Sequence, residues 1–67
     1  MIDDFKQYEG KVIIVHCVDG TTETGLCVFA GLDYDIDDRP YYSVRIKRDW
    51  YLTEIPEQSV ETIEISI

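Results

Sequence analysis

Apolar residues along this chain recur mainly with the two-residue period of β-strands rather than with the period of a helix. Residues 41–47 alternate between apolar and more polar side chains, which predicts a half-buried strand. Residues 11–18 are apolar on both sides, and a strand of that kind is covered on both faces. The pattern therefore predicts an all-β protein.

The remaining segments complete a pattern of five strands and one short helix. Further strands are expected at residues 22–32, 50–55 and 60–67, with a short turn at residues 56–59. Residues 2–8 are the one helical candidate, because two acidic side chains suit a helix start and two apolar side chains share one face. We expect this helix to be a single short turn.

The turn between the first two strands is marked by the pair Asp19-Gly20. Such a pair between strand-like runs predicts a two-residue β-hairpin loop of type I′, in which both central residues have positive φ. This register places Cys17 opposite Thr22. Two glycines in the next strand mark points at which it bends sharply, as strands of small barrels do.

The length of 67 residues predicts a single domain, 1–67, and a chain this short buries only about 60% of the surface that it exposes when unfolded. Small domains compensate with a disulfide, a metal ion or self-association. In the predicted register Cys17 and Cys27 lie too far apart for a disulfide, so both are expected to be reduced. His16 is the only histidine, which leaves no four-ligand zinc set. Self-association is the remaining option.

The charge of the chain disfavours nucleic acid as a general partner. Fourteen acidic and six basic side chains give a net charge of −8 at pH 7, and such a surface repels phosphate backbones at long range. The first residues resemble no targeting segment, and no apolar stretch is long enough to span a membrane. We therefore expect a cytoplasmic protein that does not contact a membrane.

The order of these features resembles the Sm-like (LSm-related) family. The resemblance rests on the Asp19-Gly20 turn, the bent second strand and the closing pattern I-P-x-x-x-V-x-x-I-E-I from Ile55 to Ile65, and it covers residues 8–65. It implies a small, five-stranded, strongly bent SH3-type barrel with a short N-terminal helix. A short, acidic, single-domain barrel suits a bacterial or bacteriophage protein.

Sm-like domains assemble as rings, so the resemblance implies a homo-oligomeric ring, from pentamer to heptamer. The fourth strand of one subunit pairs with the fifth strand of the next, and exposed apolar edge strands favour such pairing. Glu61 and Glu64 on the last strand act against it, because charge can keep an edge unpaired. The expected interface residues are Trp50, Tyr51, Leu52, Ile55, Val60, Ile63 and Ile65.

The uridine pocket of the family is not reproduced in this sequence. Where Sm proteins have an Ile-Arg-Gly type turn before the fifth strand, this chain has Ile55-Pro56-Glu57. Asp33 and Tyr34 match the aspartate and the aromatic residue of the family's other RNA-binding loop, but the rest of that loop is acidic and lacks asparagine. Carboxylates repel a phosphodiester, so uridine binding of the Sm type is not expected.

The same loop, residues 33–38, carries Asp33, Asp35 and Asp37 at the spacing that begins a calcium-binding EF-hand loop. The remainder of that motif is missing, because Asp38 stands where glycine is needed and Val44 stands where the bidentate glutamate is needed. We interpret the segment as a solvated acidic loop, and we expect neither a metal site nor a cofactor.

Aromatic and basic residues gather between positions 39 and 51, a stretch that holds four of the six basic side chains. Aromatic side chains interleaved with arginines can bind single-stranded RNA, but they also fill cores and subunit interfaces. The candidate nucleic-acid patch consists of Arg39, Tyr41, Arg45, Lys47 and Arg48. We favour the interface interpretation.

The sequence shows no nucleophile and base pair and no glycine-rich phosphate loop, so an enzyme is not expected. The hypothesis is a non-enzymatic ring-forming scaffold or protein-interaction module. The alternative is an RNA-binding Sm-like protein that uses the basic and aromatic patch in place of the uridine pocket.

Overall fold

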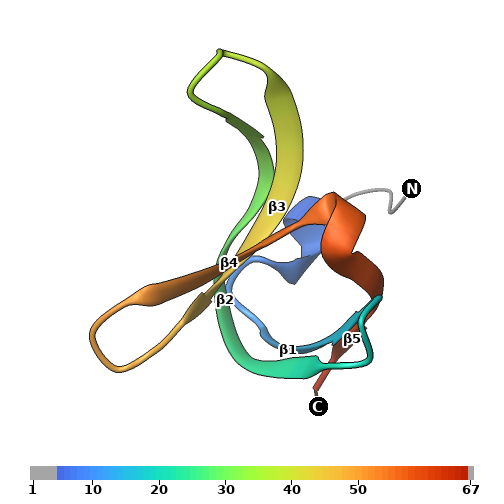
Figure 1. The fold of residues 1–67 in the computed structure, drawn as a ribbon. Helices are drawn as coiled ribbons and strands as arrows, with labels where there is room; N and C mark the ends of the chain where they lie inside the picture. The colour runs from blue at the N-terminus through green and yellow to red at the C-terminus, as the bar shows by residue number, and fades with distance from the viewer. Residues whose placement is uncertain (1–4, 67) are drawn as a thin grey trace.

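The computed structural model describes residues 5–66, and they form a five-stranded antiparallel sheet with two 3₁₀ turns (Figure 1). The strands follow the order β4-β3-β2-β1-β5. The elements are η1 (Phe5–Tyr8), β1 (Val12–Cys17), β2 (Thr22–Tyr34), β3 (Pro40–Lys47), β4 (Leu52–Pro56), η2 (Glu57–Ser59) and β5 (Val60–Ile65). The all-β class is confirmed, and the sheet is open, because β4 and β5 end its order and are not paired with each other within the described residues.

Strand β2 joins the two halves of the sheet. Its first part pairs with β1 and ends where Leu26 lies opposite Val12. Its second part pairs with β3 and ends where Tyr34 lies opposite Pro40. An irregularity between Cys27 and Phe29 separates the two parts. A bulge of this kind increases the local twist and bends the strand. One strand of 13 residues thereby serves two differently oriented ladders.

Gly25 allows the two halves to approach each other closely. A Cβ atom at this position would lie 2.5 Å from Cγ2 of Ile46, which is a fully buried side chain of β3. Any larger residue would displace Ile46 from the core, since carbon atoms do not approach so closely. Glycine at position 25 is therefore required by the space that Ile46 occupies, whereas the irregularity of the β2–β3 ladder lies between Cys27 and Phe29.

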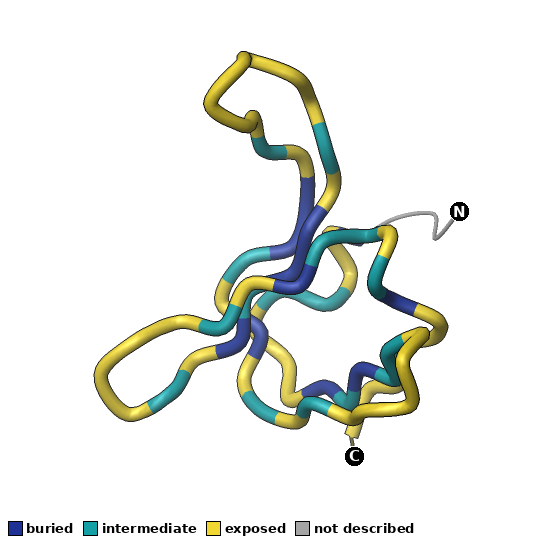
Figure 2. Tube along the Cα trace, in the orientation of Figure 1, coloured by how far each residue is buried: buried dark blue, intermediate teal, exposed yellow. Residues whose placement is uncertain are grey.

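The core lies between the inner faces of the bent sheet, with η1 closing one end (Figure 2). Ile13 and Val15 in β1 and Val44 and Ile46 in β3 have no exposed surface, which confirms the predicted inward direction of Val44 and Ile46. The prediction that residues 11–18 are covered on both faces was wrong within the chain, because Val12 is 46% and Val18 is 61% exposed. The nine buried apolar residues are Phe5, Ile13, Val15, Cys27, Ala30, Val44, Ile46, Ile55 and Val60. A core of this size is small, as the length of the chain predicts.

Two expected interface residues belong to this core instead. Ile55 is 5% exposed and Val60 is 9% exposed, and both pack among the buried residues of their own chain. Their side chains are thus covered within the chain, and the subunit interface along β4 and β5 stays a prediction. The periodic pattern marked them as apolar strand residues, but it could not distinguish the inside of this chain from the inside of an oligomer.

The turn between β1 and β2 differs by one residue from the prediction. His16, not Cys17, lies opposite Thr22, and the amide of Cys17 donates to the carbonyl of Thr21 at 2.9 Å. The loop thus has three residues, and among them only Gly20 has a positive φ, of 91°. This is a type I turn followed by a left-handed residue, a common three-residue hairpin. Asp19 stabilises it as an acceptor for the amide and hydroxyl of Thr21.

The acidic loop between β2 and β3 repeats this geometry. The amide of Asp35 donates to the carbonyl of Arg39, and the amide of Asp38 donates to the carbonyl of Asp35, at 3.0 and 2.9 Å. Asp38 takes the left-handed position with a φ of 58°. Oδ1 of Asp35 also accepts the amides of Asp37 and Arg39. The expected solvated loop is therefore an ordered hairpin turn built by aspartate side chains.

Strand β4 begins later than expected. The amide of Arg48 donates to the carbonyl of Tyr51 at 2.9 Å, and Lys47 pairs with Leu52. Trp50 and Tyr51, which the sequence placed in the fourth strand, therefore lie in the connection before it. Their aromatic rings contact each other edge to face, with centroids 4.8 Å apart. The correction places this aromatic pair at the exposed tip of a hairpin.

The N-terminal turn is shorter than the helical candidate 2–8. Phe5 to Tyr8 form η1, whereas Ile2 lies outside the described residues. Phe5 is buried, and Oε1 of Glu9 accepts the amide of Ala30 in β2 at 3.1 Å. The burial of Phe5 and the hydrogen bond to Glu9 hold η1 against β2.

The short turn at Glu57–Ser59 is confirmed as η2.

Asp38→Gly is expected to raise the free energy of unfolding by roughly 0.5–1 kcal/mol, because glycine adopts a left-handed conformation without the steric cost that a side chain incurs. Urea unfolding followed by tryptophan fluorescence measures the change. Asp37→Gly removes the same charge at a residue without positive φ, so this control should lower stability. Equal effects of the two substitutions would contradict the left-handed turn.

Glu9 is expected to make the free energy of unfolding fall as the pH is lowered into the acidic range. The hydrogen bond from Ala30 is the main reason that the pKa of Glu9 lies below its ordinary value, with Lys6 adding to the effect. A lowered folded-state pKa contributes stability that is present above the unfolded-state pKa and is lost as the pH falls through the folded-state value.

Urea unfolding between neutral and acidic pH tests this contribution. Glu9→Gln removes the titrating group and is expected to flatten the acidic side of the stability profile. Glu61→Gln, at an exposed position of β5, serves as the matched control and should leave the profile as it is. A Glu9→Gln profile that keeps the slope of the wild type would refute the role assigned to this contact.

Candidate functional site

The two edge strands offer unpaired backbone groups on opposite ends of the sheet. Because the amide of Arg48 donates to Tyr51 across the hairpin, the alternation of an antiparallel ladder turns the backbone of Leu52 and Glu54 away from β3. The amide of Ser66 donates to the carbonyl of Val12, so the backbone of Ile63 and Ile65 turns away from β1 by the same rule. Each edge can therefore accept another strand.

Proline is tolerated in β4 for the same reason. Pro56 lies two residues beyond Glu54, at a position whose backbone faces away from β3. A proline there removes no hydrogen bond from the ladder inside the chain. It does remove a donor from the outer edge, which restricts pairing with another chain to residues before it.

Apolar side chains accompany both open edges. Leu52 at the start of β4 is 52% exposed, and Ile65 at the end of β5 is 38% exposed. Ile63 is partly buried against the core. These three residues are the part of the expected interface set that the structure places at the edges. The others lie in the core or in the β3–β4 tip.

One of the two expected edge charges is bound within the chain. Nε2 of His16 lies 2.8 Å from Oε2 of Glu64, across the ladder that joins β1 and β5. This contact draws the carboxylate of Glu64 toward β1 and away from the open edge. Glu61 has no comparable contact among the described residues and remains the charge that opposes pairing there.

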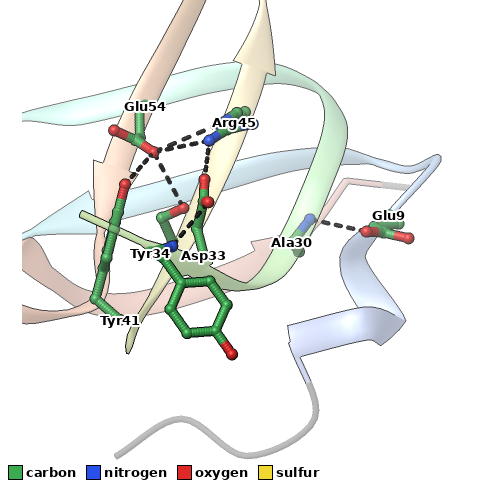
Figure 3. A network of polar contacts seen from close by, with 8 residues as sticks. Glu9, Ala30, Asp33, Tyr34, Tyr41, Arg45 and Glu54 are labelled. Carbon is green, nitrogen blue, oxygen red and sulfur yellow. Dashed lines mark hydrogen bonds and ion pairs between the residues drawn. The ribbon is translucent and has the colours of Figure 1, made fainter. Parts of the chain in front are cut away.

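A charged network covers the outer face of β2, β3 and β4 (Figure 3). Oε2 of Glu54 accepts a hydrogen bond from the hydroxyl of Tyr41 at 3.0 Å and another from Nη2 of Arg45 at 3.2 Å. Arg45 also forms an ion pair with Asp33, and its guanidinium lies 4.8 Å from the ring centroid of Phe29. Arg45 of β3 is thereby joined to side chains of both neighbouring strands, Asp33 and Phe29 of β2 and Glu54 of β4.

The electrostatics of this network follow from its geometry. The hydrogen bond to the Glu54 carboxylate raises the pKa of Tyr41, because an ionised tyrosine would face a negative charge. Desolvation acts to lower the pKa of Arg45, but Glu54 and Asp33 outweigh it and the net shift is upward. Arg45 therefore remains charged, and its charge is balanced by two acidic neighbours.

Arg48 is held in a second cluster. Its Nη2 forms an ion pair with Glu23, its Nε donates to Oγ1 of Thr53 at 3.0 Å, and its Nη1 donates to the carbonyl of Thr24 at 2.9 Å. All three nitrogens of the guanidinium have partners in the chain. Arg48 thus ties the β3–β4 hairpin to β2.

The structure separates the candidate nucleic-acid patch into two groups. Tyr41, Arg45 and Arg48 contact acidic side chains of their own chain. Arg39 and Lys47 form no ion pair within residues 5–66. The sequence signal missed the acidic partners because Glu54 and Glu23 are distant in sequence and lie opposite or beside the arginines only in the folded sheet.

The acidic loop does not assemble a metal-binding cluster. Asp33 contacts Arg45, whereas Asp35 is used to close the turn. Among residues 5–66 no three histidine, cysteine, aspartate or glutamate side chains come together in a way that could hold a metal ion.

The two cysteines are free thiols. Cys27 is buried, its Sγ donates to the carbonyl of Phe29 at 3.3 Å, and burial raises its pKa. Cys17 is partly exposed. A buried thiol with a raised pKa is a core side chain rather than a nucleophile.

A shallow groove that sequence reasoning did not identify lies beside the β3–β4 hairpin. It is lined by Leu26, Lys47, Arg48, Asp49 and Tyr51. Leu26 comes from β2, so the groove exists only because β2 and the hairpin are adjacent. Trp50, at the tip next to it, is 87% exposed. Three of the five lining residues are charged, and Lys47 forms no ion pair within residues 5–66.

Comparisons of the chain with protein-family models, with curated proteins and with solved structures give no match. Within residues 5–66, none of the helices has the length and apolar character needed to cross a membrane.

Proposed function

We propose that this chain is a non-enzymatic cytoplasmic protein of the Sm-like type, bacterial or bacteriophage in kind, which forms a homo-oligomeric ring of five to seven copies by pairing β4 of one copy with β5 of the next. In this proposal the bent sheet is an SH3-type barrel that the neighbouring subunits complete. The ring serves as a scaffold or protein-interaction module, and its partners are further copies of the chain and other proteins.

The observation that carries the proposal is the pair of open edges. A head-to-tail contact requires two different complementary surfaces on each copy, and the strand order places β4 and β5 at opposite ends of the sheet. Both edges have outward-facing amides, and both carry incompletely buried apolar side chains, Leu52 on one and Ile63 and Ile65 on the other. Strands of this kind pair with other chains unless they are protected.

The small core supports the same proposal. Nine buried apolar residues are few for a stable domain without a disulfide, and both cysteines are free. Pairing along β4 and β5 would cover the partly exposed inner side chains of β5 and satisfy edge amides. Self-association therefore supplies stability that the isolated sheet lacks.

Ile63→Pro is expected to convert the ring into monomers, because it removes an amide that points away from β1 while leaving the β1–β5 ladder intact. Light scattering after size-exclusion chromatography gives the mass, and far-ultraviolet circular dichroism shows whether the variant is folded. Ile63→Ala is the matched control, since it removes most of the side chain but retains the amide and should remain oligomeric.

Two results would contradict the proposal. A wild-type chain that is a stable monomer at micromolar concentration would exclude the ring. A folded Ile63→Pro variant with the same mass as Ile63→Ala would show that the oligomer does not use the β5 edge.

The alternative function, RNA binding through Arg39, Tyr41, Arg45, Lys47 and Arg48, is less well supported by the geometry. Arg45 and Arg48 are neutralised by Asp33, Glu54 and Glu23, which leaves few cations for a phosphate backbone. Binding driven by counterion release needs protein cations that are free to neutralise phosphates.

Oligo-uridine is expected to bind weakly or not at all at physiological salt. Fluorescence anisotropy over a range of salt concentrations measures the affinity and its salt dependence. Tight binding that weakens in both Arg39→Ala and Lys47→Ala, with a salt slope reduced by about one for each substitution, would favour the RNA-binding alternative. Lys11→Ala, which removes a cation outside the patch, is the control.

A further inference from the structure

The second half of β2 has an open edge of its own, on the arm that β2 and β3 extend from the body of the molecule (Figure 1). Within residues 5–66, backbone hydrogen bonds between β2 and the chain around β1 reach no farther than Cys27. Across the arm, the amide of Asp35 donates to the carbonyl of Arg39. By the alternation of an antiparallel ladder, the backbone groups of Leu32 and Tyr34 therefore point away from β3.

Two carboxylates mark the ends of this edge (Figure 3). Oε1 of Glu9 accepts a hydrogen bond from the amide of Ala30 at 3.1 Å, which confirms the direction of the alternation. Oδ1 of Asp33 accepts one from the amide of Tyr34 at 2.8 Å. Between them, the amide of Leu32 and the carbonyls of Leu32 and Tyr34 have no hydrogen-bond partner among the described residues. The edge thus offers more acceptors than donors.

The face of the arm that continues the core is apolar. Leu32 follows the buried Ala30 by two residues, so their side chains share one face of the sheet. Tyr42 lies opposite Leu32, and Tyr34 comes next on the same face. These side chains are exposed, Leu32 by 45%, Tyr42 by 40% and Tyr34 by 57%. A strand added beside Leu32 would cover this surface with every second side chain.

The opposite face and the end of the arm are acidic. Residues 33–40 hold four aspartates and one arginine. Asp33 is balanced by Arg45, which leaves three aspartates against Arg39. Lys6 and Glu9 balance each other at the base of the arm. The exposed part of the arm is therefore negative, and the net charge of the chain, −8, has the same sign.

We propose that this edge binds an extended basic segment of another protein, which joins β2 as a further strand. The segment donates to the carbonyls of Leu32 and Tyr34 and accepts the amide of Leu32. Its apolar side chains cover Leu32 and Tyr42, and the alternate side chains, lysine or arginine, lie on the side of Asp33 and the acidic turn. Strand addition of this kind gains affinity from backbone hydrogen bonds and specificity from alternate side chains.

Charge selects the basic segment over a second copy of this chain. Two copies that met at their arms would bring unbalanced aspartates together, whereas a basic segment is attracted by the same field. The surplus of backbone carbonyls acts in the same direction, since ammonium and guanidinium groups donate hydrogen bonds and accept none.

The site gives the proposed interaction module a class of partner, but it does not rest on the ring. It uses β2, whereas the ring uses the end strands β4 and β5. A short edge buries little area, so a single segment binds weakly. Several copies held together would bind a partner with repeated segments more tightly.

Fluorescence anisotropy with a labelled peptide of alternating valine and lysine measures the binding. One control peptide has the same composition with all valines before all lysines, and another alternates valine with glutamate. Only the alternating valine and lysine peptide is expected to bind, with an affinity that falls as the salt concentration rises. Equal binding of the two lysine peptides would overturn the proposal.

Leu32→Pro removes the amide that points away from β3 and leaves the β2–β3 ladder its hydrogen bonds. It is expected to weaken peptide binding by roughly tenfold or more. Leu32→Ala is the matched control, since it loses most of the side chain but retains the amide, and it should bind more tightly than Leu32→Pro. Binding should persist in the Ile63→Pro background, so a missing ring and a missing peptide site give different results.

Hydrogen exchange of the wild-type protein locates the peptide without any substitution. The amide of Leu32 should exchange more slowly when the peptide is added, whereas the amides of Leu52 and Ile63 on the end strands should not change. Protection at Leu52 or Ile63 without protection at Leu32 would overturn the proposal. A folded Leu32→Pro variant that binds the peptide as tightly as Leu32→Ala would do the same.

Discussion

The close approach of Ile46 to Gly25 is the contact on which the rest of the fold depends. It lets β2 pair with β1 along its first half and with β3 along its second half, so that one strand belongs to both sides of the core. The strand order that follows has β4 at one end and β5 at the other, and both remain open edges. A side chain at position 25 would collide with Ile46, so glycine keeps β2 close to this fully buried residue of β3.

Two arginines of this acidic chain, Arg45 and Arg48, form ion pairs with carboxylates of neighbouring strands. Arg45 and Arg48 each join a β-hairpin to β2 through acidic partners, so their charges stabilise the sheet instead of forming a basic surface. This use of arginine explains why a sequence segment rich in cations does not produce an exposed cationic patch. Lys47, by contrast, lines the groove beside the hairpin and has no ion pair in the described part of the chain.

Both hairpin turns around β2 rely on aspartate. Asp19 and Asp35 each accept local hydrogen bonds, and the left-handed position is taken by Gly20 in one turn and by Asp38 in the other. The sequence located both turns correctly. It missed the three-residue loop of the first turn because Asp-Gly fits both a type I′ turn and a type I turn followed by a left-handed glycine.

The alternating pattern by itself determined the strands and the inward direction of Val44 and Ile46 in β3, since side-chain direction in a strand follows directly from position. In β1, which is apolar on both sides, only the structure decided that Ile13 and Val15 face inward. Only the tertiary structure decided that Ile55 and Val60 lie in the core, that Trp50 and Tyr51 form a tip, and that Arg45 faces Glu54. These outcomes depend on which strands become neighbours and on where loops end. Both follow from long-range packing around Gly25, and a local pattern does not contain that information.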